Sequence, residues 1–179
     1  MEERTVRSQT VFAGRLLRLR VDEVEMADGR PARREIVEHP GAVAILAWDG
    51  DRLALVRQWR QATARITLEV PAGTREPGED PRQTAERELA EECGVAAGSW
   101  DAGPAFFTAP GFCTEHLSVW LATDLRPATA DRPADEAVEV TWMGLDEALA
   151  SVADGRIADA KSLVGIYWLA RRLGGSFGG

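Results

Sequence analysis

Three glutamates near the middle of the chain are spaced so that their carboxylates could act together on a metal ion. Glu88, Glu91 and Glu92 stand at positions i, i+3 and i+4, which project from one face of a helix. Like charges at this spacing repel one another and weaken an isolated helix. Hard divalent cations such as Mg²⁺ bind carboxylate oxygens and share them with substrate phosphates. A metal would remove the repulsion, whereas the alternative interpretation is a solvated acidic face.

The charge of the chain bears on what such a site could bind. Residues 73–95 contain seven acids and three bases, so their net charge is 3 − 7 = −4. The whole chain has 21 Lys and Arg residues against 29 Asp and Glu residues, which gives a formal net charge of −8. This balance argues against nucleic acid or an anionic membrane surface as a partner. An anionic small-molecule ligand would need a cation to bridge it to the protein.

A helix over residues 81–93 would position the three glutamates. Asp80 is a good N-cap, Pro81 suits the first helical position, and Gln83 can complete a capping box. Gly94 fits the left-handed position that often follows a helix. The sequence therefore predicts both ends of this helix.

Residues beside the glutamates are given structural roles. Gly73 and Gly78 allow the loop before the helix to bend freely. Ala85 and Leu89, one turn apart, are expected to pack into the core. Cys93 is expected to be a small buried residue without a chemical role.

Strands and two further helices account for most of the remaining chain. Strands are predicted over 15–24, 34–37, 42–48, 52–56, 66–70, 105–108, 117–122 and 137–142, and helices over 146–153 and 160–173. Asp49-Gly50-Asp51 is a strong hairpin signal between two of these strands. Strands interspersed with three helices predict a mixed sheet between helical layers.

Length and composition are those of one globular domain with a small extension. The chain has 179 residues, of which 45% are hydrophobic and 28% charged, which is enough for a core of its own. No apolar run approaches the ~18 residues of a membrane span, and the N-terminal residues are too polar for a signal peptide. Two cysteines give no disulfide framework, so a cytoplasmic location is expected.

The glutamates belong to a longer pattern. Residues 73–95 match G-x5-E-x7-R-E-U-x-E-E-x-G-U at every position, where U is apolar. The matching residues are Gly73, Glu79, Arg87, Glu88, Leu89, Glu91, Glu92, Gly94 and Val95. A chance match in this chain is on the order of one in a million. The pattern favours the metal site over the solvated face, and it resembles the signature of the Nudix hydrolases.

This resemblance implies a fold, a chemistry and a set of ligands. Nudix proteins have an α+β fold, an α/β/α sandwich with a mixed sheet, and typically cleave a nucleoside diphosphate linked to another moiety with Mg²⁺ or Mn²⁺. By resemblance, Glu88, Glu91, Glu92 and the backbone carbonyl of Ala72 bind two or three metal ions. Arg87 is expected to join the catalytic set by orienting a neighbouring carboxylate, with Glu79 as the expected partner.

Segments outside the pattern resemble ADP-ribose pyrophosphatases over most of residues 10–173. Arg33 and Glu35 match residues that help to hold the adenine end, although an edge strand with alternating charges would look the same. Arg60 matches a residue that contacts a substrate phosphate, to which a guanidinium is well suited, but it could be a plain surface arginine. Glu69 is expected either to contact the substrate or to support a metal.

A turn after the pattern carries a further part of this resemblance. Pro110 lies 110 − 95 = 15 positions after Val95, similar to the proline that distinguishes ADP-ribose enzymes from other Nudix groups. The resemblance then places Gly111, Phe112 and Glu115 beside the terminal ribose. A Pro-Gly turn between strands explains these residues equally well.

The resemblance also predicts the catalytic base. In ADP-ribose pyrophosphatases a glutamate in the loop corresponding to residues 128–139 activates the attacking water. Glu136 is the predicted base, and Glu139 is its rival because Pro133 and Ala134 stand where relatives often carry acids. An acid in a loop can also simply be solvated.

The predicted reaction is Mg²⁺-dependent hydrolysis of ADP-ribose to AMP and ribose 5-phosphate. One alternative is another nucleoside diphosphate derivative as substrate: an ADP-sugar, NADH, a dinucleoside polyphosphate or an oxidised nucleotide. Another is a non-catalytic module that senses ADP-ribose, although such modules usually lose glutamates that are all present here.

The resemblance further implies a domain arrangement. Residues 1–40 are expected to form an N-terminal antiparallel β region, residues 41–173 the Nudix domain, and residues 174–179 a flexible tail. Relatives are commonly homodimers in which the N-terminal strands of one chain reach the site of the partner. A homodimer is therefore expected, with the N-terminal region as its dimerisation element.

Overall fold

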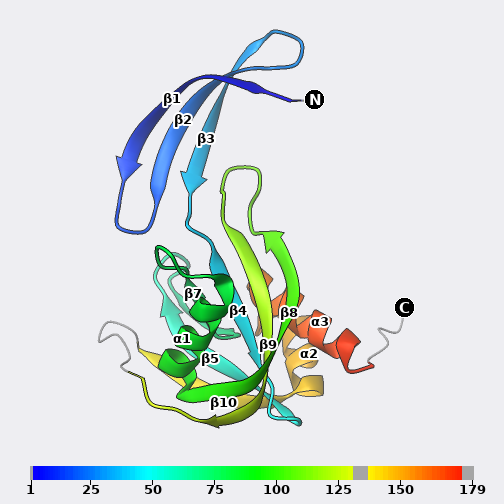
Figure 1. The fold of residues 1–179 in the computed structure, drawn as a ribbon. Helices are drawn as coiled ribbons and strands as arrows, with labels where there is room; N and C mark the ends of the chain where they lie inside the picture. The colour runs from blue at the N-terminus through cyan, green and yellow to red at the C-terminus, as the bar shows by residue number, and fades with distance from the viewer. Residues whose placement is uncertain (1, 131–136, 175–179) are drawn as a thin grey trace. The chain divides into compact units, whose positions relative to one another are not determined.

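The computed structural model describes residues 2–130 and 137–174, and Figure 1 traces their helices and strands. The chain forms two compact units. The first comprises Met1–Gly41 and Phe106–His116, and the second comprises Ala42–Ala105 and Leu117–Gly179.

The first unit contains a three-stranded antiparallel sheet. Its strands pair in the order β1-β2-β3: β1 (Arg4–Ala13), β2 (Arg18–Glu25) and β3 (Pro31–Glu38). The segment 106–116 is held to the end of β3, because Val37 N donates to Phe112 O at 2.7 Å and Thr114 N donates to Val37 O at 2.9 Å. The later segment 106–116 therefore groups with the N-terminal strands, while the domain boundary at residue 40 stays a prediction.

The strand predicted over 15–24 is displaced in the structure. Its first residues lie in the turn between β1 and β2, and β1 itself was not predicted. All ten residues of β1 are exposed. A strand without a buried face has no hydrophobic alternation that a sequence pattern could reveal.

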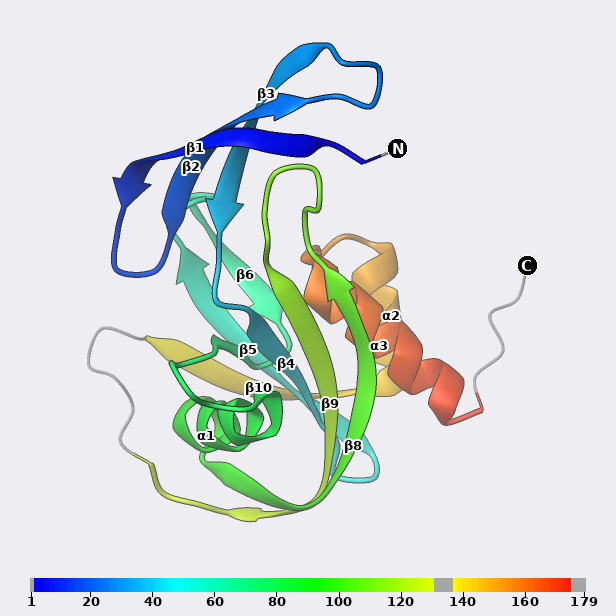
Figure 2. The same ribbon diagram turned by 45° about the horizontal axis from the view of Figure 1, so that its top comes forward.

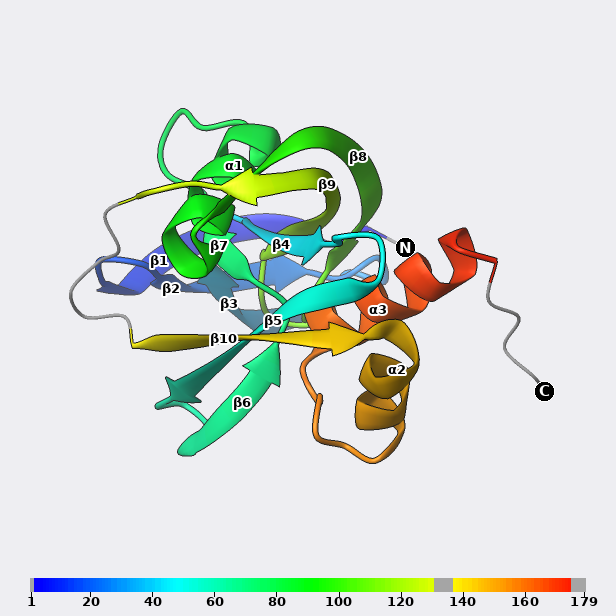
Figure 3. The ribbon, with the colours of Figure 1, turned by 90° about the horizontal axis from the view of Figure 1, so that it is seen from below.

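The second unit contains two sheets. Its strands are β4 (Ala42–Ala47), β5 (Arg52–Arg60), β6 (Arg65–Glu69), β7 (Ala72–Thr74), β8 (Val95–Phe107), β9 (His116–Pro127) and β10 (Val138–Gly144). The last residues of β8 and the first residue of β9 belong to the segment 106–116 of the first unit. One sheet has the order β7-β4-β9-β8 and the other the order β10-β5-β6 (Figure 3). Because β4 is parallel to β9 and antiparallel to β7, the first sheet is mixed, as predicted.

Helices cover both sides of these sheets, α1 (Pro81–Cys93) on one side and α2 (Leu145–Ala153) and α3 (Ala160–Arg172) on the other (Figure 2). On the α3 side, a Cβ at Gly165 would lie only 3.0 Å from Leu46 Cδ2, so glycine permits the close approach. The predicted α/β/α sandwich is confirmed.

Among the described helices, none has both the length and the apolar character needed to cross a membrane.

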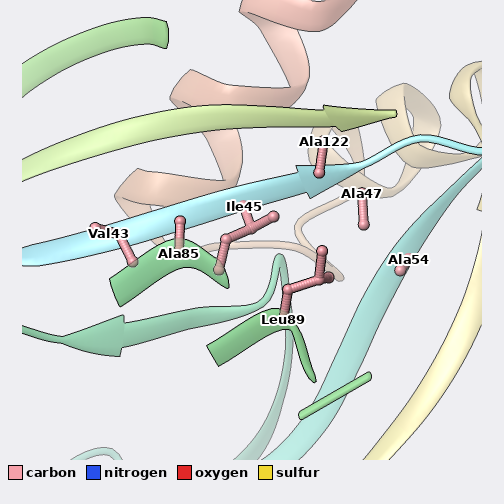
Figure 4. Packing of buried hydrophobic residues seen from close by; sticks show 7 residues of the cluster. All are labelled: Val43, Ile45, Ala47, Ala54, Ala85, Leu89 and Ala122. Carbon is pink, nitrogen blue, oxygen red and sulfur yellow. The ribbon is translucent and has the colours of Figure 1, made fainter. Parts of the chain in front are cut away.

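The core on the α1 side is formed where α1 packs on β4. Figure 4 shows its fully buried members: Val43, Ile45, Ala47, Ala54, Ala85, Leu89 and Ala122. Alternate residues of β4 face α1, while Ala85 and Leu89 project from successive turns of the helix. The prediction that these two helix residues are buried is confirmed. Glu88 and Glu92 follow Ala85 and Leu89 by three residues each and are buried beside them, so this packing also fixes where the two glutamates lie.

The hairpin predicted around Asp49 is confirmed only at its turn. Asp49 does form a turn, because its Oδ1 accepts hydrogen bonds from Asp51 N at 2.9 Å and Arg52 N at 2.7 Å. However, β4 and β5 lie in different sheets and are joined by an isolated bridge between Trp48 and Leu53. Both edges of β4 are already paired, with β7 and with β9, so β5 pairs with β6 and β10 instead.

Candidate active site

Helix α1 begins and ends where the sequence predicts. The Asp80 side chain accepts hydrogen bonds from Arg82 N at 2.8 Å and Gln83 N at 3.0 Å. The Gln83 side chain in turn accepts from Asp80 N at 3.1 Å, which completes the capping box. Gly94 closes the helix in the left-handed conformation, with φ at 67°. The glutamates are thus carried by a helix that is fixed at both ends.

Arg87 gathers three carboxylates around one guanidinium. Its Nε and Nη2 donate to the two oxygens of Glu79 at 2.9 and 3.1 Å. Its Nη1 donates to Glu88 Oε1 at 2.6 Å and to Glu91 Oε2 at 3.1 Å, and its Nη2 also reaches Thr74 O at 3.2 Å. The expected contact between Arg87 and Glu79 is present, with the bidentate geometry that suits a guanidinium.

The Arg87–Glu79 pair stays charged at neutral pH and well into the acidic range. Hydrogen bonds from Arg87, from the backbone N–H of Glu76 and from the hydroxyl of Thr84 outweigh burial and hold the pKa of Glu79 at about 2. The same pairing raises the pKa of Arg87 above its ordinary value. Glu79 therefore acts as a fixed anchor for the guanidinium that orients Glu88 and Glu91.

Glu88 and Glu92 lie close to β7. Glu92 Oε2 accepts a hydrogen bond from Ala72 N at 3.0 Å, and the two glutamates are 8% and 4% exposed. A Cβ at Gly73 would lie 1.8 Å from Glu88 Cδ, so only glycine leaves room for the carboxyl group. The expectation that Gly73 serves to bend the loop is wrong, since the positive φ in this loop, 89°, is that of Gly78.

The chemistry of this donor set suits a hard divalent cation. Glu88, Glu91 and Glu92 offer carboxylate oxygens beside the backbone of β7, and oxygen ligands are those that Mg²⁺ and Mn²⁺ prefer. Across residues 2–130 and 137–174, no group of three His, Cys, Asp or Glu side chains is arranged to hold a metal ion. Glu88 and Glu91 turn toward Arg87 and Glu92 toward Ala72, so joint coordination would require them to reorient.

A second charged cluster joins β5, β6 and α3. Arg60 Nε and Nη2 donate to Glu69 Oε1 and Oε2 at 2.9 and 2.7 Å. Thr67 Oγ1 donates to Oε1 at 2.5 Å, and Lys161 Nζ donates to Oε2. Glu69 is 2% exposed and accepts four hydrogen bonds. Its carboxylate is thereby committed to holding Arg60, whose side chain is 41% exposed.

Electrostatics link this cluster to the acidic face of α1. Burial alone would raise the pKa of Glu69, but the hydrogen bonds from Arg60 and Lys161 and the charge of Lys161 lower it to about 2. The pKa of Arg60 is raised, chiefly by its hydrogen bonds with Glu69, and the charges of Glu92 and Asp159 add to this effect. Arg60 is therefore a permanently charged donor within electrostatic range of Glu92.

Glu139 does not lie on the same face of its sheet as Arg60. It stands opposite Arg57 in the β10–β5 ladder, and Arg57 Nη1 donates to its carboxylate at 3.3 Å. Because side chains alternate along a strand, Arg57 and Arg60 project from opposite faces. The Glu139 side chain is 71% exposed. The other predicted base, Glu136, lies outside the described residues.

The residues predicted to hold the adenine end are in the first unit. Arg33 and Glu35 are exposed and share one face of β3. Arg33 Nη2 lies 3.7 Å from Glu23 Oε1 across the ladder to β2. The two side chains thus share a face of the strand, and their contact with a substrate stays a prediction.

The residues predicted to hold the ribose are also in the first unit. Gly111 and Phe112 form a turn in which Phe112 N donates to Ala109 O at 3.1 Å. Glu115 accepts a hydrogen bond of 2.6 Å from the Thr108 hydroxyl. The predicted turn is therefore present, while the ribose contact stays a prediction.

Sequence reasoning missed Lys161 and the N-cap of α3, Asp159. Lys161 Nζ lies between the two carboxylates, donating to Glu69 and, at 2.8 Å, to Asp159 Oδ1. Glu69 and Lys161 are 92 positions apart, so no local pattern connects them. Composition did carry a signal, because Lys161 is the only lysine beside 20 arginines.

Comparison with known protein families defines the class of protein. Residues 37–163 match the NUDIX domain, and residues 3–37 match the nucleoside diphosphate sugar hydrolase N-terminal domain. The chain belongs to the Nudix family, as the sequence predicted, and is a Nudix hydrolase.

Particular relatives are similar over nearly the whole chain. The chain is 41% identical to an ADP-ribose pyrophosphatase from Bacillus subtilis (strain 168), over 94% of this chain and 93% of the relative. It is 39% identical to a methanol dehydrogenase activator from Bacillus methanolicus, over 94% and 92%. It is 39% identical to an ADP-ribose pyrophosphatase from Mycobacterium tuberculosis, over 90% and 80%.

A solved structure agrees with the fold. The crystal structure of an ADP compounds hydrolase superposes with a TM-score of 0.87, covering 97% of this chain and 95% of the other, at 22% identity. At that identity the likeness supports the sandwich fold and not the substrate.

Replacing Gly73 with alanine is expected to weaken Mn²⁺ binding by about tenfold or more, because the new methyl group would displace the Glu88 carboxyl. Electron paramagnetic resonance of free Mn²⁺ measures the affinity. Gly144→Ala is the matched control, since a Cβ there meets no atom within 4 Å. Wild-type affinity in a folded Gly73→Ala protein would contradict the placement of Glu88 at a metal.

The Glu69 charge is expected to stabilise the fold at neutral pH and to lose that effect in acid. Its pKa is about 2 in the folded protein against an ordinary 4.5, so the stabilisation is present above about pH 4.5 and declines as the pH falls toward 2. Urea unfolding should give Glu69→Gln a free energy of unfolding about 3 kcal/mol below wild type at pH 7. Exposed Glu86→Gln should differ by less than about 0.5 kcal/mol. A Glu69→Gln difference that does not change with pH would contradict the assignment.

Proposed function

We propose that the chain hydrolyses the pyrophosphate bond of ADP-ribose to AMP and ribose 5-phosphate, using Mg²⁺ or Mn²⁺. The observation that carries this proposal is the carboxylate face of α1, organised by Arg87 and within electrostatic range of the partly exposed cation Arg60. A diphosphate needs such a combination of metal ligands and a fixed cationic donor. Two relatives at 39% and 41% identity are named ADP-ribose pyrophosphatase, which supports this substrate.

Each residue of the proposed active site has a separate role in metal or substrate binding. Glu88, Glu91, Glu92 and the Ala72 carbonyl would hold two or three metal ions, which when bound neutralise the diphosphate and lower the pKa of a water. Arg87 orients two of these carboxylates through its own anchor on Glu79. Arg60, held by Glu69, donates to a phosphate oxygen of the substrate.

The base is assigned to Glu136, outside the metal-binding helix. A carboxylate that coordinates a metal is a poor proton acceptor, so a separate acid is chemically reasonable. The exposed position of Glu139, paired with Arg57 on the face opposite Arg60, favours Glu136 over its rival.

The two ends of the substrate are assigned to residues of the first unit. Arg33 and Glu35 would bind the adenine end, and the turn at Gly111 and Phe112 would bind the terminal ribose together with Glu115. The exposed pair on β3 supports the first assignment. The turn, with Phe112 exposed, supports the second.

A nucleoside diphosphate sugar is the second candidate substrate. The observation in its favour is that residues 3–37 match the nucleoside diphosphate sugar hydrolase N-terminal domain. The metal chemistry would be the same for both substrates, and the residues that contact the second moiety would differ.

The assembly and location of the protein are also proposals. We propose a homodimer in the cytoplasm, with residues 1–40 as the dimerisation element, residues 41–173 as the Nudix domain and 174–179 as a tail. Every residue of β1 is exposed, including the apolar Val6, Val11 and Phe12, which supports the role of the N-terminal region. The small number of cysteines fits a reducing compartment.

The proposed reaction is tested by release of AMP from a panel of substrates with Mg²⁺. We expect ADP-ribose to give the highest kcat/KM, ahead of ADP-glucose, NADH and diadenosine polyphosphates, and EDTA to abolish turnover. Glu92→Gln should lower kcat by orders of magnitude in a folded protein, whereas Glu86→Gln should not. Turnover that persists in EDTA, or wild-type activity of Glu92→Gln, would refute the metal chemistry. Preference for ADP-glucose would point to the second substrate.

The assignment of the base is tested by two single substitutions. Glu136→Gln is expected to lower kcat by about 10²–10⁴-fold, because the proton of the attacking water loses its acceptor. Glu139→Gln should leave kcat within about twofold of wild type, since the exposed pair with Arg57 contributes little. An equal loss in Glu139→Gln would exchange the two roles.

A further inference from the structure

Lys161 has an environment that is unusual for a lysine. It is the only lysine in the chain, its side chain is 13% exposed, and it lies in the first turn of α3. Its ammonium group donates to Glu69 Oε2 and to Asp159 Oδ1. Burying an ammonium is costly, and two carboxylate partners offset that cost.

The start of α3 holds this lysine in a fixed frame. Asp159 is the N-cap of α3, and its Oδ1 accepts from Ser162 N at 3.1 Å. The Ser162 hydroxyl oxygen accepts a buried hydrogen bond of 2.8 Å from Val70 N, the residue after Glu69. The helix start and the end of β6 are therefore tied together beside the Lys161–Glu69 contact.

The charge balance around Arg60 indicates what the lysine contributes. Arg60 is influenced by three carboxylates, those of Glu69, Glu92 and Asp159. Without Lys161, the positive charge of Arg60 faces these three negative charges, a sum of 1 − 3 = −2. With Lys161 the sum is 2 − 3 = −1. Lys161 therefore lowers the negative charge that a phosphate meets at Arg60, and bound metal ions would lower it further.

Hydrogen bonding leads to the same conclusion. Glu69 Oε2 accepts hydrogen bonds from both Arg60 Nη2 and Lys161 Nζ. Lys161 therefore helps to fix the carboxylate to which Arg60 is bound. The compact ammonium of Lys161 bridges Glu69 and Asp159, so it also ties this carboxylate to the start of α3.

We propose that Lys161 is a positioning residue for the diphosphate substrate: it holds Glu69 in place, so that Arg60 keeps its orientation and its capacity to bind a phosphate oxygen. The proposal rests on the proposed function, in which Arg60 binds the substrate. Lys161 acts through Arg60 and does not itself contact the substrate.

A double-mutant cycle tests whether Lys161 acts through Arg60. The probe is α,β-methylene ADP-ribose, which cannot be cleaved between its phosphorus atoms, and its Kd is measured by calorimetry with Mg²⁺. We expect Lys161→Met to weaken binding by about tenfold, and Arg60→Gln by about tenfold or more. The double variant should bind within about twofold of Arg60→Gln alone. If the two substitutions weaken binding independently, so that their fold-changes in Kd multiply in the double variant, the proposal is overturned.

The matched control removes the same charge from the same helix. Arg171→Met changes an exposed residue in the last turn of α3 and should leave the Kd unchanged. An equal loss of affinity in Arg171→Met would indicate a general effect of net charge and would overturn the proposal. In the hydrolysis assay, Lys161→Met should raise KM about tenfold and change kcat less, as expected for a phosphate contact made before the chemical step.

A second measurement needs no substitution at Lys161. Protein grown with [ε-¹³C]lysine gives a single side-chain lysine signal, since the chain has one lysine. Addition of the analogue should shift this signal in wild type and in Arg171→Met, but not in Arg60→Gln at saturating analogue. An unmoved wild-type signal at saturation would overturn the coupling. If the wild-type protein neither binds the analogue nor cleaves ADP-ribose, the proposed function fails. If the wild-type protein binds the analogue but the effects of the two substitutions on the binding free energy simply add, only the Lys161 proposal fails.

Discussion

The burial of carboxylates against the backbone of β7 is the constraint on which the site depends. Glu88 and Glu92 are almost fully buried, and an unpaired buried carboxylate costs several kcal/mol. The fold meets this cost locally: Arg87 pairs with Glu88, and the Ala72 N–H donates to Glu92. The absence of a side chain at Gly73 makes the contact sterically feasible. These groups come together because α1 packs on β4 beside β7.

An arginine held by two hydrogen bonds to an ionised carboxylate occurs twice in the second unit. Glu79 anchors Arg87 and Glu69 anchors Arg60, each through two hydrogen bonds to a carboxylate whose pKa is about 2. A permanently ionised, fully hydrogen-bonded carboxylate fixes a long arginine side chain at little entropic cost to binding. The anchored arginines then differ in what they face. Arg87 faces other carboxylates and orients them, whereas the side chain of Arg60 remains partly exposed.

Features set by neighbours in the sequence were predictable, and those set by distant contacts were not. The caps of α1, the Arg87–Glu79 contact and the burial of Leu89 all follow from local spacing. The hairpin prediction was right only at the turn, because beyond the bridge between Trp48 and Leu53 the two strands pair with other partners. Strand β8 was predicted only over its last residues, since Gly98 and Gly103 weaken the pattern. A Cβ at Gly103 would lie 3.1 Å from Val119 O of β9, a requirement that one sequence does not reveal.

Lys161 shows how composition can carry information that local patterns lack. Its contact with Glu69 spans 92 positions, and no motif predicts it. Yet the chain uses arginine at 20 of its 21 basic positions, including its surface ion pairs and the last turn of α3. The single exception is informative because of where it lies: the one lysine is 13% exposed and bridges two carboxylates of the cluster that holds Arg60. A residue type that the chain uses once, at a buried ion cluster, marks that cluster as a place where the ammonium group has a specific role.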